Sequence, residues 1–239
     1  MSDMFRITIR RQDSASSASY LQTFACPATD RMTAANFLRE LNASERIVDI
    51  EGNEAAPVAW ECACLQKKCG ACAMRINGNP ALACSVFLHD VANRRGEILL
   101  EPLRKFPVIR DLKVDRSRVF ELLKEMHVWL SGKDSYEFGQ SKELQFHASE
   151  CMLCGICLEV CPTFGSYPDF AGAAGMVKAG KIIDQNQDDA HRREVCKEYW
   201  SHFFKYCCQS LSCTKACPLH LPLEEIQAAA NRQAVWKKA

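Results

Sequence analysis

Cysteine is the residue type whose number and spacing in this chain could do chemistry. The sequence holds fifteen cysteines among 239 residues, and eleven of them fall into three groups. The first residues, Met-Ser-Asp-Met-Phe-Arg, show no apolar segment followed by a small-residue cleavage site, so no export signal is expected. Grouped cysteines without an export signal favour metal ligation over disulfide bonds.

The first group has the spacing C-x4-C-x2-C with a fourth cysteine further along. Its members are Cys64, Cys69, Cys72 and Cys84. This is the plant-type ferredoxin spacing, which predicts a [2Fe–2S] cluster. The small residues Gly70 and Ala71 would let the backbone approach the cluster and donate N–H hydrogen bonds to its sulfurs. The alternative is a zinc site, but such sites usually pair two C-x2-C motifs, and this group has one.

Two further runs lie in the second half of the chain, and each ends in Cys-Pro. The first is a complete C-x2-C-x2-C-x3-C-P run that contains Cys151, Cys154, Cys157 and Cys161. The second contains Cys207, Cys213 and Cys217, with Ser210 where a fourth cysteine would stand. In paired runs of this kind, the last cysteine of each run ligates the cluster of the other run.

The missing cysteine changes the composition expected for one cluster. The crossing pattern predicts a [4Fe–4S] cluster with four thiolates, from Cys151, Cys154, Cys157 and Cys217. It leaves three thiolates, from Cys161, Cys207 and Cys213, for the other cluster. A cubane with three protein ligands tends to lose its fourth iron, so this site is expected to hold [3Fe–4S]. The alternative is a [4Fe–4S] cluster that Ser210 completes.

Four cysteines stand outside these assignments. Cys62 is a rival to Cys64, and Cys208 is a rival to Cys207, but the motif spacing favours Cys64 and Cys207. Cys62 is interpreted as a buried or idle thiol beside the loop, and the isolated Cys26 and Cys196 as packed thiols.

The elements that position these cysteines predict an α+β chain, with strands in front and helices behind. The front half is expected to contain a strand around Phe5–Ile9, a strand around Tyr20–Phe24, a helix from a cap at Asp30 to Leu41, and a returning strand over Arg95–Leu100. The back half is expected to contain a helix capped by Asp115 or Ser117 and ended by Gly132, and another with Pro222 in its first turn. The proline-containing stretch Glu101–Pro107 predicts a boundary between domains 1–105 and 106–239.

Composition excludes several functions. A net charge of +1 gives no basis for nucleic-acid binding, and no stretch approaches the ~20 apolar residues of a membrane-spanning helix. The glycines of Gly172–Gly175 form no phosphate loop and are explained by close helix packing. The chain also lacks Gly-x-Gly-x-x-Gly, so we expect it to bind neither nicotinamide nor flavin in a Rossmann fold.

Taken together, the cysteine layout resembles the iron–sulfur subunit of succinate dehydrogenase and fumarate reductase. Cys69-Gly-Ala-Cys72-Ala-Met with Ile76-Asn-Gly78 is similar to that family's cluster loop and the strand that follows it, and Pro102–Ser117 is similar to its interdomain segment. The resemblance implies an N-terminal β-grasp ferredoxin domain followed by an all-α, bacterial-ferredoxin-like domain. It also implies an electron-transfer subunit of a succinate:quinone oxidoreductase or quinol:fumarate reductase, with no substrate site of its own.

The resemblance also implies partners. These are an FAD-containing flavoprotein subunit, a cytochrome b-type membrane anchor that often carries haem b, and a quinone near the [3Fe–4S] cluster. The chain would then be peripheral, on the cytoplasmic face of the membrane. Ubiquinone-type members carry a tryptophan shortly after the cysteine matching Cys161 and a histidine after the one matching Cys207. This chain has Pro162–Tyr167 and Cys208 there, which favours menaquinone.

Two other functions remain as alternatives. The iron–sulfur subunit of another flavin-dependent oxidoreductase, such as a 2-hydroxy-acid oxidoreductase, would usually carry two complete cysteine runs. A zinc-stabilised binding module would leave the crossing pattern and the trailing Pro162 and Pro218 without an explanation.

Overall fold

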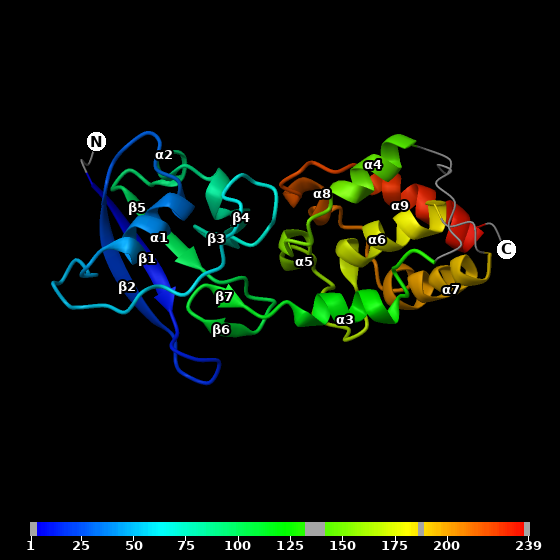
Figure 1. Cartoon of the computed structure of the whole chain (residues 1–239), viewed down its shortest axis with the longest axis horizontal. Coiled ribbons are helices and arrows are strands. Elements are labelled where there is room, and N and C mark those ends of the chain that lie inside the picture. The colour runs from blue at the N-terminus through cyan, green and yellow to red at the C-terminus, as the bar shows by residue number, and fades with distance from the viewer. Residues whose placement is uncertain (1–3, 132–141, 186–188, 237–239) are drawn as a thin grey trace. The chain divides into compact units, whose positions relative to one another are not determined.

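The chain forms two compact units, Met1–Asp115 and Arg116–Ala239, in a computed structural model (Figure 1). The structure describes residues 4–131, 142–185 and 189–236. Gly132, predicted to end a helix, lies outside these residues. The ten residues that follow the predicted boundary at 105/106 belong to the first unit, where they include two short strands.

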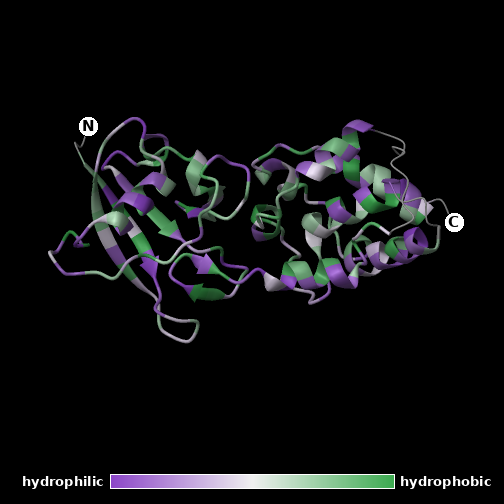
Figure 2. Cartoon of the chain, in the orientation of Figure 1, coloured by the Kyte–Doolittle hydropathy of each residue, from purple (hydrophilic) through white to green (hydrophobic). Residues whose placement is uncertain are grey.

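A mixed five-stranded sheet forms the core of the first unit. Its strands are β1 (Met4–Arg11), β2 (Tyr20–Pro27), β3 (Ala73–Ile76), β4 (Asn79–Leu82) and β5 (Glu97–Glu101), in the order β2-β1-β5-β3-β4. β1 and β5 run parallel and the other neighbours antiparallel. Phe5, Ile7 and Ile9 are buried while their neighbours alternate outward, as the period of a strand requires. Figure 2 shows that the strands of this sheet carry both hydrophobic and hydrophilic residues. The predicted strands in this half are therefore confirmed.

Helix α1 (Ala34–Ala43) adds Phe37 and Leu38 to the same core. Its N-cap is Thr33, whose hydroxyl accepts a hydrogen bond from the N–H of Asn36 at 3.1 Å. The prediction that Asp30 caps this helix was wrong, because Thr33 stands three residues before Asn36 and can reach its N–H. The remaining elements of the unit are a 3-10 turn η1 (Ala83–Ser85), helix α2 (Leu88–Val91), β6 (Val108–Arg110) and β7 (Lys113–Val114).

A buried ion pair fixes the segment that leads to the first cysteine group. Arg11 donates to the carboxylate of Asp111, with Nε and Oδ1 2.8 Å apart, and the two side chains are 1% and 0% exposed. Asp111 also accepts from the N–H of Ala59 at 2.8 Å, and Arg11 Nη2 donates to the carbonyl of Ala56 at 3.1 Å. The chain at 56–59 is thereby held beside the end of β1.

The described elements of the second unit are helical. They are α3 (Ser117–Glu125), α4 (Lys142–Glu150), α5 (Ile156–Glu159), α6 (Gly172–Gln185), α7 (Asp189–Tyr199), a π-helical turn η2 (Trp200–Phe204), α8 (Ser212–Ala216), α9 (Leu223–Asn231) and a second π-helical turn η3 (Arg232–Trp236). The predicted helix through Leu130 ends earlier, at Glu125, because His127 has φ +55°, which breaks the helical path. Pro222 stands directly before α9.

Helix α6 lies in the middle of the second unit, in contact with α3, α4, α5, α7 and α9 (Figure 1). Two of its glycines allow this close packing. A Cβ on Gly175 would come within 2.3 Å of the Ala171 Cβ, and one on Gly172 within 2.4 Å of a Leu158 methyl. The interpretation of this glycine stretch as a packing feature is confirmed.

Candidate iron–sulfur cluster sites

The loop before β3 turns its backbone N–H groups toward two cysteine sulfurs. Leu65, Lys67 and Gly70 all have positive φ, which lets the chain curl tightly. The N–H groups of Gln66 and Lys68 lie 3.3 and 3.4 Å from Cys64 Sγ. The N–H of Lys67 lies 3.3 Å from Cys84 Sγ. These bonds favour thiolates in the loop.

The β3–β4 hairpin brings the other two cysteines of the group together. Cys72 stands directly before β3 and Cys84 closely after β4, and the register pairs Ala73 with Leu82. The open end of the hairpin therefore places Cys72 beside Cys84. Burial is the main reason that the pKa of Cys72 rises to about 12; the N–H of Cys84 opposes the rise and the Cys84 thiol adds to it.

Cys64 and Cys69 form a corresponding pair. Hydrogen bonds from the N–H groups of Gln66 and Lys68, and then from the Cys69 thiol, lower the pKa of Cys64 to about 7. The four cysteines are thus arranged as two neighbouring pairs, Cys64 with Cys69 and Cys72 with Cys84. Each iron of a [2Fe–2S] cluster takes two protein thiolates, so this donor set fits the group. Cys62, by contrast, is exposed, so the prediction that it is buried was wrong. The alternative, an idle thiol beside the loop, stays a prediction.

In the second unit, the first cysteine run and the end of the second meet around one cavity. Leu153 and Gly155 have positive φ, so the backbone turns back between successive cysteines. The cavity is lined by apolar side chains, among them Val177 and Leu221, and by the sulfur-bearing residues Cys151, Cys154, Cys157 and Cys217. Burial raises the pKa of Cys157 well above its usual value, and the neighbouring cysteines add to the rise. Four thiols around an apolar cavity fit a [4Fe–4S] cluster.

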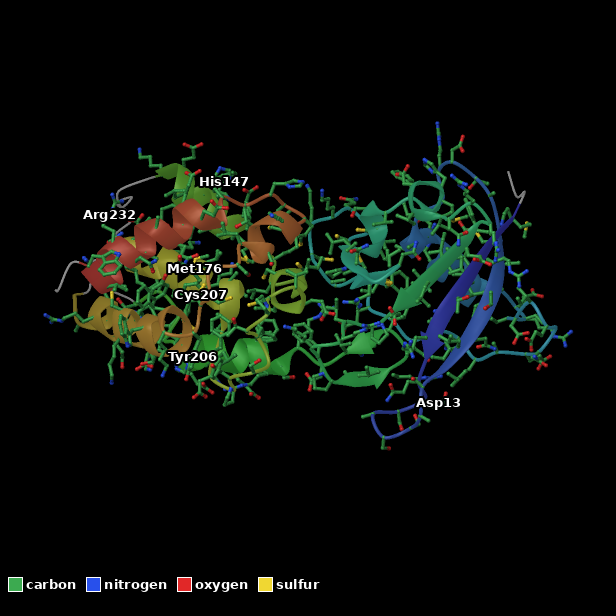
Figure 3. The ribbon with its side chains drawn as sticks, turned by 180° about the vertical axis from the view of Figure 1, so that it is seen from behind. Asp13, His147, Met176, Tyr206, Cys207 and Arg232 are labelled. Atoms are coloured by element: carbon green, nitrogen blue, oxygen red, sulfur yellow. The ribbon has the colours of Figure 1, made fainter. Side chains whose placement is uncertain are left out.

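A second cavity gathers the remaining cysteines of the two runs. Its cysteines are Cys161, Cys207, Cys208 and Cys213. Ser210 also lines this cavity, and so do Phe170, Met176 and Phe203; Figure 3 shows Met176 and Cys207 in this unit. Burial raises the pKa of Cys207, with Cys161 and Cys208 contributing, and burial also raises that of Cys213. Gln227 Nε2 lies 3.9 Å from Cys207 Sγ.

Cys208 differs from its neighbours in exposure and in partners. It is exposed, and Thr163 Oγ1 donates to its sulfur at 3.3 Å. This bond, followed by bonds from the N–H and hydroxyl of Ser210, lowers the pKa of Cys208. The hydroxyl groups of Thr163 and Ser210 thus both donate to the Cys208 sulfur. Ser210 therefore bonds to a cysteine that is not one of the three predicted ligands.

The cysteines outside the groups lie elsewhere. Cys26 is buried in β2, and burial raises its pKa to about 11. Cys196, on α7, is partly exposed, and burial is the main cause of its raised pKa. Within residues 4–131, 142–185 and 189–236, no three His, Cys, Asp or Glu side chains are grouped as a single metal ion would require. No iron of these clusters takes more than two protein thiolates, so this spacing is compatible with clusters.

Sequence analysis did not find two polar side chains at these sites. Lys178 Nζ donates to the Cys151 carbonyl at 2.8 Å, and Gln227 approaches Cys207 from α9. Neither belongs to a cysteine motif. Lys178 follows Ala174 by four positions on α6, and this helical spacing is the signal that could have placed it beside the cavity.

Comparison with protein families assigns both halves of the chain. A family described as "2Fe-2S iron-sulfur cluster binding domain" matches residues 6–121. Another, described as "4Fe-4S dicluster domain", matches residues 147–221. The chain is therefore an iron–sulfur protein with a 2Fe–2S domain followed by a 4Fe–4S dicluster domain.

Comparison with individual relatives identifies the family of iron–sulfur proteins to which the chain belongs. The succinate dehydrogenase iron–sulfur subunit of Bacillus subtilis is 33% identical over 238 residues, which cover 95% of this chain and 91% of the relative. The fumarate reductase iron–sulfur subunit of Haemophilus influenzae is 29% identical over 182 residues, covering 69% of this chain and 70% of the relative. The chain belongs to the family of iron–sulfur subunits of succinate dehydrogenase and fumarate reductase, as the cysteine layout predicts. These are subunits of succinate:quinone oxidoreductase-class enzymes.

A solved structure shares the fold. The structure described as "Mycobacterium smegmatis Sdh1 complex in the apo form" matches with a TM-score of 0.78 and 21% sequence identity, covering 100% of this chain and 99% of that one. None of the helices in the described part of the chain is long and apolar enough to cross a membrane.

Proposed function

We propose that this chain passes electrons between an FAD-containing flavoprotein subunit and membrane quinone, through [2Fe–2S], [4Fe–4S] and [3Fe–4S] clusters. The observation that carries the proposal is the gathering of eleven cysteines into three sets, two of which mix cysteines from both C-terminal runs. When bound, such clusters supply one-electron redox centres.

The proposed ligands follow the three sets. Cys64, Cys69, Cys72 and Cys84 hold [2Fe–2S]. Cys151, Cys154, Cys157 and Cys217 hold [4Fe–4S], and Cys161, Cys207 and Cys213 hold [3Fe–4S]. The proposed domains are a β-grasp ferredoxin domain, 1–105, and an all-α ferredoxin-like domain, 106–239. The parallel pairing of β1 with β5 and the helical second unit support domains of these two kinds, although residues 106–115 belong to the first compact unit.

The residues of the chain set the conditions for electron transfer. Backbone N–H groups around Cys64 and Cys84 donate hydrogen bonds to sulfur, which raises a cluster's reduction potential. Apolar side chains and cysteines line the first cavity of the second unit, whereas Gln209, Ser210 and Gln227 add polar groups to the second. Ala173 of α6 lines both cavities. Its small side chain favours a short distance between the two proposed clusters.

The proposed quinone site adjoins the third cysteine set. Tyr167, 46% exposed, stacks on Tyr206 with ring centroids 4.5 Å apart, and Cys208 is exposed nearby in the sequence. A partly exposed pair of tyrosine rings, each with an apolar ring and a polar hydroxyl, suits a quinone ring. We propose menaquinone as the quinone, a cytochrome b-type anchor that holds the chain on the cytoplasmic face of the membrane, and haem b only in the partner subunits.

The experiment uses the purified complex and the variant Cys154→Ala. We expect the variant to bleach its flavin with succinate but to lose reduction of a menaquinone analogue, because electrons cannot leave the flavoprotein. The unaltered complex should reduce the menaquinone analogue with a higher kcat/KM than a ubiquinone analogue. Retained quinone reduction in Cys154→Ala would contradict electron transfer through this chain. Preference for the ubiquinone analogue would contradict the proposed quinone.

A further inference from the structure

Lys178 places an amine beside the first cavity of the second unit. Its Nζ donates to the carbonyl of Cys151 at 2.8 Å. On α6 it follows Ala174 by four positions, and Ala174 and Val177 line the cavity that contains Cys151. Side chains four apart share one face of a helix, and helical side chains point toward the N-terminus of their helix. Lys178 therefore reaches from α6 to the first residue of the cysteine run.

The position of this amine matters because it is partly buried. Its side chain is partly exposed, whereas the neighbouring residues Val177 and Ala179 are buried. A charge in such a place is screened by water and salt much less than a charge on the open surface. The amine lies 2.8 Å from the Cys151 carbonyl, so its charge acts at short range on the backbone of the cysteine run.

The carbonyl contact alone does not require a lysine. A neutral amide of similar length could donate the same hydrogen bond to Cys151. The feature that only a lysine or arginine supplies is the positive charge. Reduction of a cluster adds one negative charge and breaks no bond, and net charge near a cluster is one of the factors that set its potential.

We propose that Lys178 raises the reduction potential of the cluster held by Cys151, Cys154, Cys157 and Cys217, through its positive charge, while its hydrogen bond positions the Cys151 backbone. This inference rests on the proposed [4Fe–4S] ligand set. Lys178 is a positioning residue that acts on the electron-transfer step without ligating iron.

Three substitutions separate the charge from the hydrogen bond. Lys178→Gln keeps a donor for the Cys151 carbonyl and removes the charge. Lys178→Met removes both, and Lys178→Arg keeps both. The matched control is Lys197→Met, which removes the same charge from a side chain that is 79% exposed on α7. The measurement is a potentiometric titration of the purified complex. The electron paramagnetic resonance signal of the reduced four-iron cluster is recorded at each potential.

We expect Lys178→Gln and Lys178→Met to lower the equilibrium constant for reduction at least tenfold, which is ~59 mV for a one-electron couple. Lys178→Arg and Lys197→Met should titrate as the unaltered complex does. An unchanged potential in Lys178→Gln, with the signal intact, would overturn the inference and leave the proposed function standing. An equal shift in Lys197→Met would overturn it too. A four-iron signal missing from the unaltered complex would refute the ligand set and this inference with it.

Discussion

Ser210 is the single residue on which the composition of the third site depends. It lies between Gln209 and Leu211, whose φ values are +53° and +56°, so the chain bends sharply there. The residue lines the same cavity as Cys161, Cys207 and Cys213. A thiolate in its place would supply the fourth ligand of a cubane. We therefore expect Ser210→Cys to convert the three-iron cluster into a four-iron cluster, with about one more iron per chain and loss of the oxidised three-iron signal.

Ser212→Cys is the matched control for that substitution. Ser212 is two residues further on, at the start of α8, and does not line the cavity. It should leave both the iron count and the three-iron signal unchanged. A three-iron signal that persists in Ser210→Cys would show that the absent cysteine does not determine the cluster type.

Cys62 and Cys64 offer a second test at the residue scale. Cys64 Sγ accepts two backbone N–H groups, whereas Cys62 is exposed. We expect Cys62→Ser to keep the electron paramagnetic resonance signal of the reduced two-iron cluster, and Cys64→Ala to lose it. The opposite pattern would assign the ligand to Cys62.

At the scale of elements, the buried pair of Arg11 and Asp111 joins β1 to the segment before the cluster loop. Removal of one partner would leave an uncompensated buried charge and free the N–H of Ala59. We expect Asp111→Ala to lower the free energy of unfolding by ~3–5 kcal/mol. Chemical denaturation followed by circular dichroism measures this value. The exposed pair of Arg46 and Glu54 is the control, and Glu54→Ala should cost at most ~1 kcal/mol.

Substitution by alanine is expected to have different effects on stability at two glycines of α6. A Cβ at Gly175 would meet Ala171 at 2.3 Å and the sulfur of the fully buried Met126 at 3.0 Å. A Cβ at Gly180 would meet Ala230 and Ile226 at 3.4 Å, close to ordinary contact. We expect Gly175→Ala to destabilise the chain by ~1–3 kcal/mol through overpacking.

Gly180→Ala should be neutral or stabilise the chain by up to ~1 kcal/mol, because alanine favours the helix. The melting temperatures of both variants, measured by thermal unfolding, test these two predictions. Equal melting temperatures for Gly175→Ala and the unaltered chain would contradict the packing of α6 described here.

Local sequence patterns predicted the presence of helices and strands better than the residues at which they begin and end. The alternation of Phe5, Ile7 and Ile9 predicts β1 because it reflects which residues are buried. The apolar face that continues to Leu130 does not show that His127 adopts positive φ and ends α3 early. Likewise, Asp30 and Thr33 are both capping residues by type. The path of the chain, which no local pattern contains, decides in favour of Thr33.

For the whole molecule, motif spacing predicted which cysteines are neighbours across long stretches of sequence. Cys217 lines one cavity with Cys151, and Cys161 lines the other with Cys213, as the crossing pattern predicts. That these cysteines ligate iron stays a prediction. The polar neighbours Lys178 and Gln227 could not be predicted from motifs, since they reach the sites from helices whose packing depends on the complete fold.

The measurement that tests the central claim most directly is electron paramagnetic resonance of the purified complex, oxidised and then reduced, with an iron count. Three clusters on this chain predict a three-iron signal when oxidised, a two-iron signal when reduced, and about nine irons per chain. About ten irons with a silent oxidised sample would contradict the three-iron assignment. Zinc in place of iron, with no signal in either state, would contradict electron transfer by this chain.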